Sequence, residues 1–240
     1  MKKTLSAIFL MMTMVFVTAC GNSSSSNVTP PAEPKQESSS ASTVAEKKSD
    51  IVPDVPEKHW ARNEVLYLVK KEIMLPYGDG TFKGDRNITN YEFALALAKI
   101  LDDTYKGTVP SGSAHPFTDV PAGHWAYDSV CKLAAMGITE GYADGTFRGD
   151  RNATRYETAL YAAHLLAKVA PNTAKSIKLG MPFPDIPKDH WAYNAVSLLA
   201  MAGVDEGYGD GTYRGDRPRT RYEAAQLLAK LHMFLKKAKG

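Results

Sequence analysis

A sequence block recurs three times after residue 50, at intervals of 65 and 66 residues. Each copy opens with the pattern Asp-x-Pro-x-x-His-Trp, which places tryptophans at Trp60, Trp125 and Trp191. A stretch that reads Tyr-x-Asp-Gly-Thr-aromatic-base-Gly-Asp-Arg begins 17 residues after each tryptophan. A fixed period of this kind predicts three copies of one supersecondary unit. Equivalent surfaces on each copy favour a binding protein over an enzyme with a single catalytic centre.

Each copy is predicted to form a helix, a structured loop and a second helix. In the second copy, apolar residues follow helical spacing from Trp125, and Gly137 can end that helix in the left-handed conformation. Thr154 and Glu157 form the pattern of a capping box, in which each side chain accepts a hydrogen bond from a backbone N–H at the helix start. One such helix pair has too little core to fold alone, so we expect the three copies to pack together.

The first nineteen residues are predicted to be an export signal. Lys2 and Lys3 precede a thirteen-residue apolar run, residues 7–19, which is too short to span a bilayer as a helix. The run ends in Val-Thr-Ala before Cys20 and resembles the lipobox of bacterial lipoproteins. That resemblance implies cleavage before Cys20 and acylation of its thiol and amino group. The alternative is an ordinary signal peptide that happens to contain a cysteine.

Residues 20–50 are predicted to be a disordered linker. The thirty residues after Cys20 hold nine serines, three prolines and no aromatic residue. Such a segment cannot bury enough apolar surface to offset the entropy of ordering it. As a flexible coil it would span about 30 Å. We therefore expect it to act as a spacer.

The charge of the chain gives no sign of a nucleic acid partner. The formal net charge is +3, and it falls to +1 once Lys2 and Lys3 are removed with the signal. No nucleophile elbow, zinc-protease motif or phosphate loop occurs in the sequence. We therefore expect no enzyme activity and no cofactor.

Three motifs are the Asp-x-x-x-x-x-Trp-Ala opening of every copy, the Gly-Tyr-x-Asp-Gly-Thr-Phe loop and the Thr-Arg-Tyr-Glu box. The loop is complete in the second copy and the box in the second and third, and both vary elsewhere. Together the three motifs resemble the S-layer homology (SLH) domain, a bacterial cell-wall-binding module. The resemblance covers about residues 51–236. It implies an all-α fold in which three helix-loop-helix repeats form a pseudo-threefold bundle with ligand grooves between neighbours. The expected repeats are residues 51–108, 116–174 and 182–236, and the molecule is expected to be a monomer.

The resemblance also implies a partner and a location. SLH modules bind peptidoglycan or a secondary cell wall polymer attached to it. The family box usually reads Thr-Arg-Ala-Glu, and Tyr156 and Tyr222 replace its alanine, as in the subgroup of diderm bacteria. We therefore expect a lipid-anchored protein of the outer membrane that faces the periplasm and tethers this membrane to the wall. The alternatives are a surface lipoprotein of a monoderm that binds a pyruvylated polymer, and a glycan-modifying enzyme that docks through its repeats.

Two arginines are the leading candidates for ligand contact. Arg155 and Arg221 stand at the first helical position after the capping threonine, where a cation is mildly unfavourable beside the positive end of the helix dipole. The capping box does not require them, so we expect them to pair with a carboxylate or donate to sugar oxygens. An internal ion pair is the alternative.

The other expected groove residues have structural alternatives. The tryptophans either stack on sugar rings or belong to the core. The aspartates that open each copy either reach the groove or brace the proline turn through their own backbone. The glutamates of the box cap the helix as well. These residues are Trp60, Trp125, Trp191, Asp54, Asp119, Asp185, Glu157 and Glu223.

The first repeat departs from the pattern of the other two. Asn90 stands where they have the arginine of the box, and Glu72 stands at the position of the helix-ending glycine. Leu75-Pro76 also replaces the Glu-Gly pair before the loop. We expect the groove that depends on this box to be weakened.

No metal site is expected. The Asp144 loop carries Asp first and Gly sixth, as a calcium loop does, but Arg155 stands where a bidentate glutamate is needed. The histidines before each tryptophan have no acid or cysteine at ligand spacing.

Overall fold

The computed structural model describes residues 51–109, 117–180 and 183–238. The chain divides into two units, Met1–Glu33 and Pro34–Gly240, and all of these residues belong to the second unit. The expected export signal, Cys20 and the linker lie outside the described residues. Within the described part of the chain, no helix is both long enough and apolar enough to cross a membrane.

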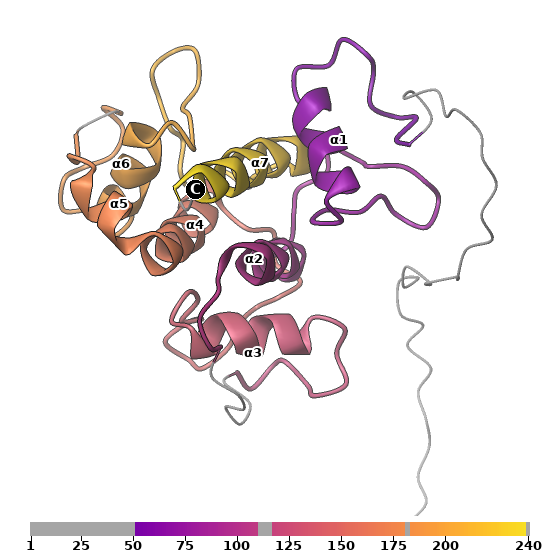
Figure 1. The fold of residues 1–240 in the computed structure, drawn as a ribbon, viewed down its shortest axis with the longest axis horizontal. Helices are drawn as coiled ribbons and strands as arrows, with labels where there is room; N and C mark the ends of the chain where they lie inside the picture. Colours follow the sequence, from indigo (N-terminus) through magenta and orange to yellow (C-terminus); the bar gives the residue numbers. More distant parts are fainter. Residues whose placement is uncertain (1–50, 110–116, 181–182, 239–240) are drawn as a thin grey trace, which may run out of the picture. The chain divides into compact units, whose positions relative to one another are not determined.

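The described residues form seven helices and no strand (Figure 1). This result confirms the all-α fold that the sequence predicts. The helices are α1 (Arg62–Lys70), α2 (Asn90–Thr104), α3 (Tyr127–Ala135), α4 (Arg155–Val169), α5 (Pro171–Ser176), α6 (Tyr193–Met201) and α7 (Arg221–Lys237). The short helix α5, which begins at a proline, was not predicted.

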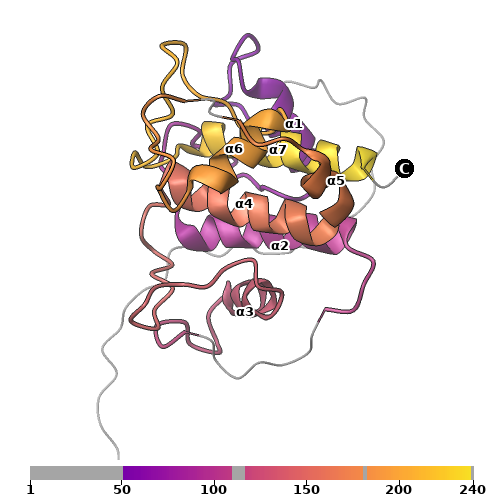
Figure 2. The same ribbon diagram turned by 90° about the vertical axis from the view of Figure 1, so that its left-hand side faces the viewer.

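The second helices of the three repeats, α2, α4 and α7, pack against one another at the centre. Helix α4 buries ten of its fifteen residues, whereas α3 buries only two of nine, as a central and a peripheral helix should. Figure 2 shows α2 and α4 side by side, with α3 outside them. The long helices therefore supply most of the shared core.

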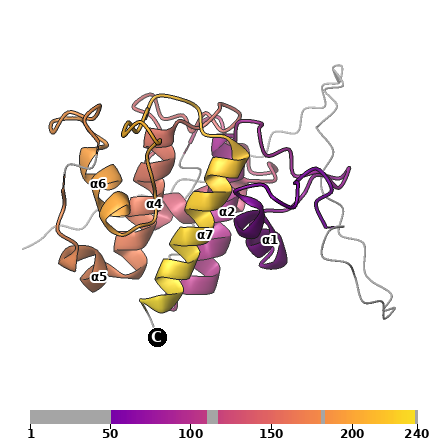
Figure 3. The same cartoon turned by 90° about the horizontal axis from the view of Figure 1, so that it is seen from above.

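Each first helix packs on the second helix of the preceding repeat. Helix α3 lies against α2, and α6 lies against α4. Helix α1 lies against α7, so the first repeat closes on the last (Figures 1 and 3). The three repeats thus form a closed ring in which every repeat contacts both others.

The capping boxes begin the long helices as predicted. Thr89, Thr154 and Thr220 each accept a hydrogen bond from the backbone N–H of the glutamate three residues on, and the glutamate side chain accepts one in return. Each box satisfies two backbone donors that the helix itself leaves without partners. The positions at which α2, α4 and α7 begin are therefore encoded locally.

Backbone hydrogen bonds tie the repeats together near the pseudo-threefold axis. Ile88 N–H donates to Arg219 O over 3.0 Å, Ala153 N–H to Ile88 O over 2.9 Å, and Arg219 N–H to Ala153 O over 2.9 Å. Each residue directly precedes a capping threonine, so the three bonds run in a circle through equivalent positions. This circle fixes the angular relation of the three long helices.

The tyrosine of each box packs on a glycine of the next repeat. A Cβ added to Gly149 would lie 2.0 Å from the ring of Tyr91, and one added to Gly215 would lie 2.1 Å from the ring of Tyr156. Only glycine permits this approach. The tyrosine that replaces the usual alanine is therefore a packing residue between repeats.

Candidate functional site: the junctions between repeats

The site residues gather where the start of one repeat's long helix meets the loop of the next repeat. There Arg155 N–H donates to Arg217 O over 3.0 Å, and Tyr156 N–H donates to Gly215 O over 2.9 Å. We call this contact the 2–3 junction. The equivalent contacts of repeat three with repeat one and of repeat one with repeat two are the 3–1 and 1–2 junctions.

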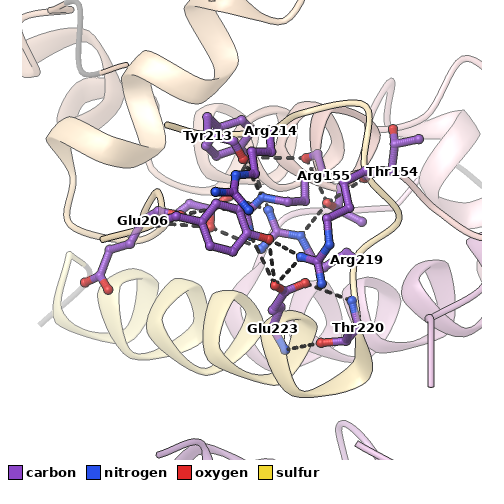
Figure 4. A network of polar contacts seen from close by, with 12 residues as sticks. Thr154, Arg155, Glu206, Tyr213, Arg214, Arg219, Thr220 and Glu223 are labelled. Atoms are coloured by element: carbon purple, nitrogen blue, oxygen red, sulfur yellow. Dashed lines mark hydrogen bonds and ion pairs between the residues drawn. The ribbon is translucent and has the colours of Figure 1, made fainter. Parts of the chain in front are cut away.

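Arg155 is the buried centre of the 2–3 junction (Figure 4). Its Nε donates to Tyr213 O over 2.9 Å, and its Nη2 donates to Glu206 O over 2.6 Å. Its Nη1 lies 3.9 Å from the Glu223 carboxylate, and the guanidinium stacks over the rings of Tyr208 and Tyr213 at 4.9 and 4.5 Å. In the structure, Arg155 therefore holds the loop of repeat three, while its contact with a ligand stays a prediction.

Arg221 repeats this arrangement at the 3–1 junction. Its Nε donates to Phe82 O over 2.8 Å, its Nη2 donates to Leu75 O over 3.2 Å, and its Nη1 lies 3.6 Å from Glu92. Burial lowers the pKa of Arg221, although the nearby Tyr77 and Glu92 act to raise it. Both arginines therefore take part in an internal ion pair, which is the alternative role that the sequence left open.

Asn90 takes the place of the arginine at the 1–2 junction. Its Nδ2 donates to Arg148 O over 3.1 Å, while its buried Oδ1 has no hydrogen-bond partner. The amide is too short to reach the positions that the guanidinium groups occupy at the other junctions. The departures of repeat one therefore affect two junctions, because Asn90 serves the 1–2 junction and Leu75 serves the 3–1 junction.

The glutamates of the box do more than cap their helices. Glu223 Oε1 accepts from Tyr208 Oη over 2.8 Å and from Arg217 Nη1 over 2.7 Å. Burial opposes ionisation of Glu223, but the hydrogen bonds from Thr220, Arg217 and Tyr208 outweigh it and lower the pKa. The pKa of Glu157 is lowered in the same way, so both groups are carboxylates at neutral pH.

The aspartates that open each repeat hold the loop of their own repeat. The Asp119 carboxylate accepts from the backbone N–H groups of Phe147 and Arg148, both over 2.7 Å. Asp54 and Asp185 accept from the equivalent pairs of N–H groups. They thus brace the Asp-Gly-Thr loop rather than the proline turn, and they remain exposed at the junctions.

The tryptophans are surface residues. Trp60, Trp125 and Trp191 are 55%, 50% and 57% exposed, so they do not belong to the core. Each indole meets the tyrosine of the preceding box edge-on, as Trp191 does with Tyr156 at 5.7 Å between ring centres. An exposed ring whose orientation is fixed by a buried neighbour suits contact with a flat apolar surface.

The histidine before each tryptophan supports this arrangement. His190 Nδ1 accepts from Ala192 N–H over 3.3 Å, and its ring lies 4.3 Å from the ring of Tyr156. His59 and His124 do the same in their repeats. Among residues 51–109, 117–180 and 183–238, no group of three or more His, Cys, Asp or Glu is placed to hold a metal ion.

A row of exposed basic residues at the junctions was missed. Lys83, Arg148 and Arg214 adopt positive φ values of 52°, 52° and 54°, which is uncommon for residues with a side chain. The Arg148 guanidinium pairs with the Asp144 carboxylate at 2.8 Å, and the Thr146 side chain and this arginine lower the pKa of Asp144 to about 2. The sequence signal that could have revealed these residues is the basic residue at this position in all three copies.

A second basic position lies next to the capping glutamates. The Arg217 side chain is 41% exposed and bonds Tyr208 Oη as well as Glu223. Arg86 and Arg151 make the same contacts in the other repeats. Each junction therefore presents both an exposed indole and exposed cationic groups.

The 2–3 junction is the most complete of the three. It has the buried arginine, the Glu-Gly pair and the full loop, whereas each of the others lacks one of these features.

An open hollow of about 600 Å³ also lies beside Trp191, between α4, α5 and α6. Its walls include Leu160, His164, Lys175 and Leu198.

Residues 53–94, 116–159 and 182–225 match the S-layer homology domain. The chain belongs to the S-layer homology family. Each matched segment runs from the proline turn into the first turns of the long helix, so the match covers the residues that build the junctions. The three SLH domains that the motifs predict are therefore confirmed.

Several surface proteins are similar to this SLH chain. Cell surface glycoprotein 1 of Acetivibrio thermocellus is 35% identical over 158 residues, which cover 63% of this chain and 7% of that protein. The cellulosome-anchoring protein of the same organism is 31% identical over 154 residues, 64% of this chain and 33% of that protein. Outer membrane protein SlpA of Deinococcus radiodurans is 46% identical over 78 residues, 32% of this chain and 6% of that protein.

Proposed function

We propose that this protein is a non-catalytic anchor of the bacterial cell envelope, which binds peptidoglycan or a polymer attached to it through the junctions between its SLH domains. The observation that carries the proposal is the threefold repetition of one junction, each copy of which has an exposed tryptophan and exposed cationic groups. A regular polymer offers the same group many times, so equivalent junctions can bind it together. Individually weak contacts then add to firm attachment.

The roles of the residues differ within a junction. Trp60, Trp125 and Trp191 are the proposed sugar-contacting groups, since their rings are exposed and held in place by tyrosine. Arg155 and Arg221 shape their junctions from within, because both guanidinium groups are buried against carbonyl oxygens. Their positive charge also adds a positive potential to the groove. Aspartates and glutamates complete the wall of the groove, and these are Asp54, Asp119, Asp185, Glu157 and Glu223.

Acylation of Cys20 is proposed as the second attachment. The sequence before Cys20 supports it, and several acyl chains anchor durably at about 0.8 kcal/mol per buried CH₂. The protein would then tether the outer membrane to the wall from the periplasmic side. The similarity to an outer membrane protein of Deinococcus radiodurans favours this location.

Binding to purified sacculi tests the proposal. Trp191→Ala should weaken binding about tenfold, because a stacked ring contributes on the order of 1–1.5 kcal/mol. Met233→Ala is the matched control, since Met233 is exposed on α7 and lies outside the junctions. Each variant is melted thermally in parallel. Native melts with undiminished binding after replacement of all three tryptophans would contradict the proposal.

A second candidate function keeps the module and changes its setting. The names of the two Acetivibrio thermocellus proteins, a cell surface glycoprotein and a cellulosome-anchoring protein, favour a location at the cell surface. The second candidate is therefore a surface lipoprotein that binds a secondary wall polymer. Sacculi stripped of covalently attached polymer separate the two candidates. Retained binding supports peptidoglycan as the ligand, and lost binding supports the polymer. Release of soluble glycan fragments during the incubation would instead indicate a wall-modifying enzyme.

A further inference from the structure

A polar cluster lies at the contact between α1 and α7, where the first repeat meets the last. Tyr67 of α1 and Asp103 of α2 reach the two ring nitrogens of His232 of α7. Tyr67 Oη lies 2.9 Å from Nδ1, and Asp103 Oδ2 lies 2.7 Å from Nε2. The His232 side chain itself is fully buried. One imidazole ring therefore joins three helices, and we call these three residues the histidine cluster.

The other two repeats carry an apolar side chain at the position of this histidine. Counted from the start of each long helix, the residues equivalent to His232 are Leu101 in α2 and Leu166 in α4, and both are fully buried. At the contact between α4 and α6, the residues equivalent to Tyr67 and His232 are Leu198 and Leu166. The packing at this position therefore does not require an ionisable group.

The proton positions in the cluster follow from its hydrogen bonds. The bonds from Lys236 and His232 lower the pKa of Asp103, so this side chain is a carboxylate at neutral pH and can only accept. Nε2 of His232 must then carry a hydrogen and donate to it. In the neutral ring the other nitrogen, Nδ1, has a lone pair, which accepts from the Tyr67 hydroxyl. Both nitrogens are therefore satisfied when the imidazole is uncharged.

The surroundings oppose a second proton on this ring. Burial lowers the pKa of His232, although Asp103 of α2 acts to raise it. Lys236 of α7 and Lys71, just after the end of α1, act to lower it further. A proton on Nδ1 would also deprive the Tyr67 hydroxyl of its acceptor. The buried ring is therefore held neutral, and it takes up a proton more readily when the helices separate.

Acid should accordingly weaken the contact between α1 and α7. A group whose pKa is lower in the closed form than in the open form binds more protons when the contact is open. The stability from the neutral ring is then fully present above about pH 6.5, the ordinary pKa of histidine, and declines as the pH falls below that value. The histidine cluster therefore responds in the mildly acidic range.

The 3–1 junction depends on the same contact. Trp60 lies two residues before the start of α1, and Tyr222 is the second residue of α7. Their ring centres lie 6.1 Å apart, with one ring edge-on to the other. Separation of α1 from α7 would draw these two rings apart, so the histidine cluster is coupled to this junction.

We propose that Tyr67, His232 and Asp103 form an acid-sensitive latch at the ring closure. With the imidazole neutral, the latch holds α1 on α7. Protonation of His232 releases α1 and, with it, the 3–1 junction. The latch is a property of the contact between the helices and does not require wall binding, so this proposal and the proposed function can fail separately.

The test is amide hydrogen exchange of the full chain at about pH 7.5 and about pH 5.5, with each rate corrected for intrinsic exchange at that pH. We expect the protection of α1 to fall by up to about tenfold relative to that of α6, since the lower pH is about one unit below the ordinary pKa of histidine. An equal fall in both helices, or no fall in α1, would overturn the proposal.

Two variants connect the fall to the histidine cluster. His232→Leu installs the residue that the other long helices have at this position, so the protection of α1 should no longer depend on pH. His164→Lys is the matched control, because it replaces another partly buried histidine by the lysine that α2 and α7 have at this position, and the fall in α1 should remain. A fall that persists in His232→Leu would overturn the proposal and assign the effect to another group.

A third variant separates the charge of the latch from its packing. Asp103→Asn keeps an oxygen that can accept from Nε2, but it removes the charge that acts to raise the pKa of His232. The closed form should then resist the proton to lower pH, so the fall in α1 should become larger and continue further into the acid range. A fall of unchanged or smaller size would contradict the latch. Should His232→Leu fail to fold, Asp103→Asn alone decides.

Discussion

The buried ion pair of repeat three allows a quantitative test of how this fold is held together. Arg219 and Asp205 have side chains that are 1% and 4% exposed, with contacts of 2.6 Å between Nη2 and Oδ2 and 3.1 Å between Nη1 and Oδ1. Tyr213 Oη donates to Asp205 Oδ2 over 2.8 Å, and Arg219 Nε donates to Thr158 Oγ1 over 2.8 Å. The charged groups of Arg219 and Asp205 are therefore hydrogen-bonded to each other and to Tyr213 and Thr158.

Asp205→Ala should destabilise the protein by about 3–5 kcal/mol, because it leaves a buried guanidinium without a counter-ion. The tyrosine hydroxyl also loses a partner, and this loss falls within the same range. Most single substitutions cost less than this. The measurement is the free energy of unfolding from urea denaturation, followed by circular dichroism and tryptophan fluorescence.

The chain itself provides the matched control. Repeat one has Met74, Phe82 and Ile88 at the positions of Asp205, Tyr213 and Arg219, so it shows an apolar solution to the same packing problem. The triple variant Asp205→Met, Tyr213→Phe, Arg219→Ile should recover most of the lost stability, since a whole ion pair can often be replaced by apolar groups of similar volume. A loss below about 1 kcal/mol for Asp205→Ala, or no recovery in the triple variant, would refute this reasoning.

Three further outcomes are expected. Gly149→Ala should cost about 1–3 kcal/mol because its Cβ would meet the ring of Tyr91, whereas Gly123→Ala, with nothing within 4 Å, should be near neutral in the same urea assay. Burial alone would raise the pKa of Asp205, but the neighbouring Arg219 outweighs burial, so the pKa in the folded state is lowered. The stability that this carboxylate contributes should therefore be present above about pH 5 and lost as the pH falls below about 4. The free energy of unfolding, measured against pH, should decline less in the uncharged triple variant. Cys20→Ser should move the protein from the membrane fraction to the soluble exported fraction, and a variant that still sediments with membranes in wall-free cells would contradict acylation as the anchor.

The parts of the fold that the sequence predicts best are those with local causes. Thr154 and Glu157 are three residues apart, and their capping box depends on little else, so the start of α4 could be placed from the sequence. Gly137 adopts φ 65° and ends α3 as expected. In repeat one Glu72 takes the same conformation, with φ 56°, and Lys99 Nζ donates to its carbonyl over 2.6 Å. That compensation comes from another helix and has no local signal.

The sequence proposes a set of site residues, but it does not give their arrangement. Arg155 stood out because a cation is unfavourable at a helix start, yet its partners are carbonyl oxygens some fifty residues away, Glu206 O and Tyr213 O. Those contacts depend on which repeat follows which around the ring, and the sequence period does not contain that information. The exposure of Trp191 does not follow from the sequence for the same reason, because only an element of another repeat could have buried this side chain.

The contact between α1 and α7 has a consequence for the number of repeats. In repeat proteins that stack in a line, each unit touches only its neighbours, so units can be gained or lost at the ends and the remainder still folds. Here the earliest helix of the bundle rests on the latest, and the circle of hydrogen bonds through Ile88, Ala153 and Arg219 closes after three steps. Deleting one repeat would leave two helices without partners, and inserting a fourth would open the circle. Copy number is thus set by the geometry of closure, and this chain can change the sequence of its repeats far more readily than their count.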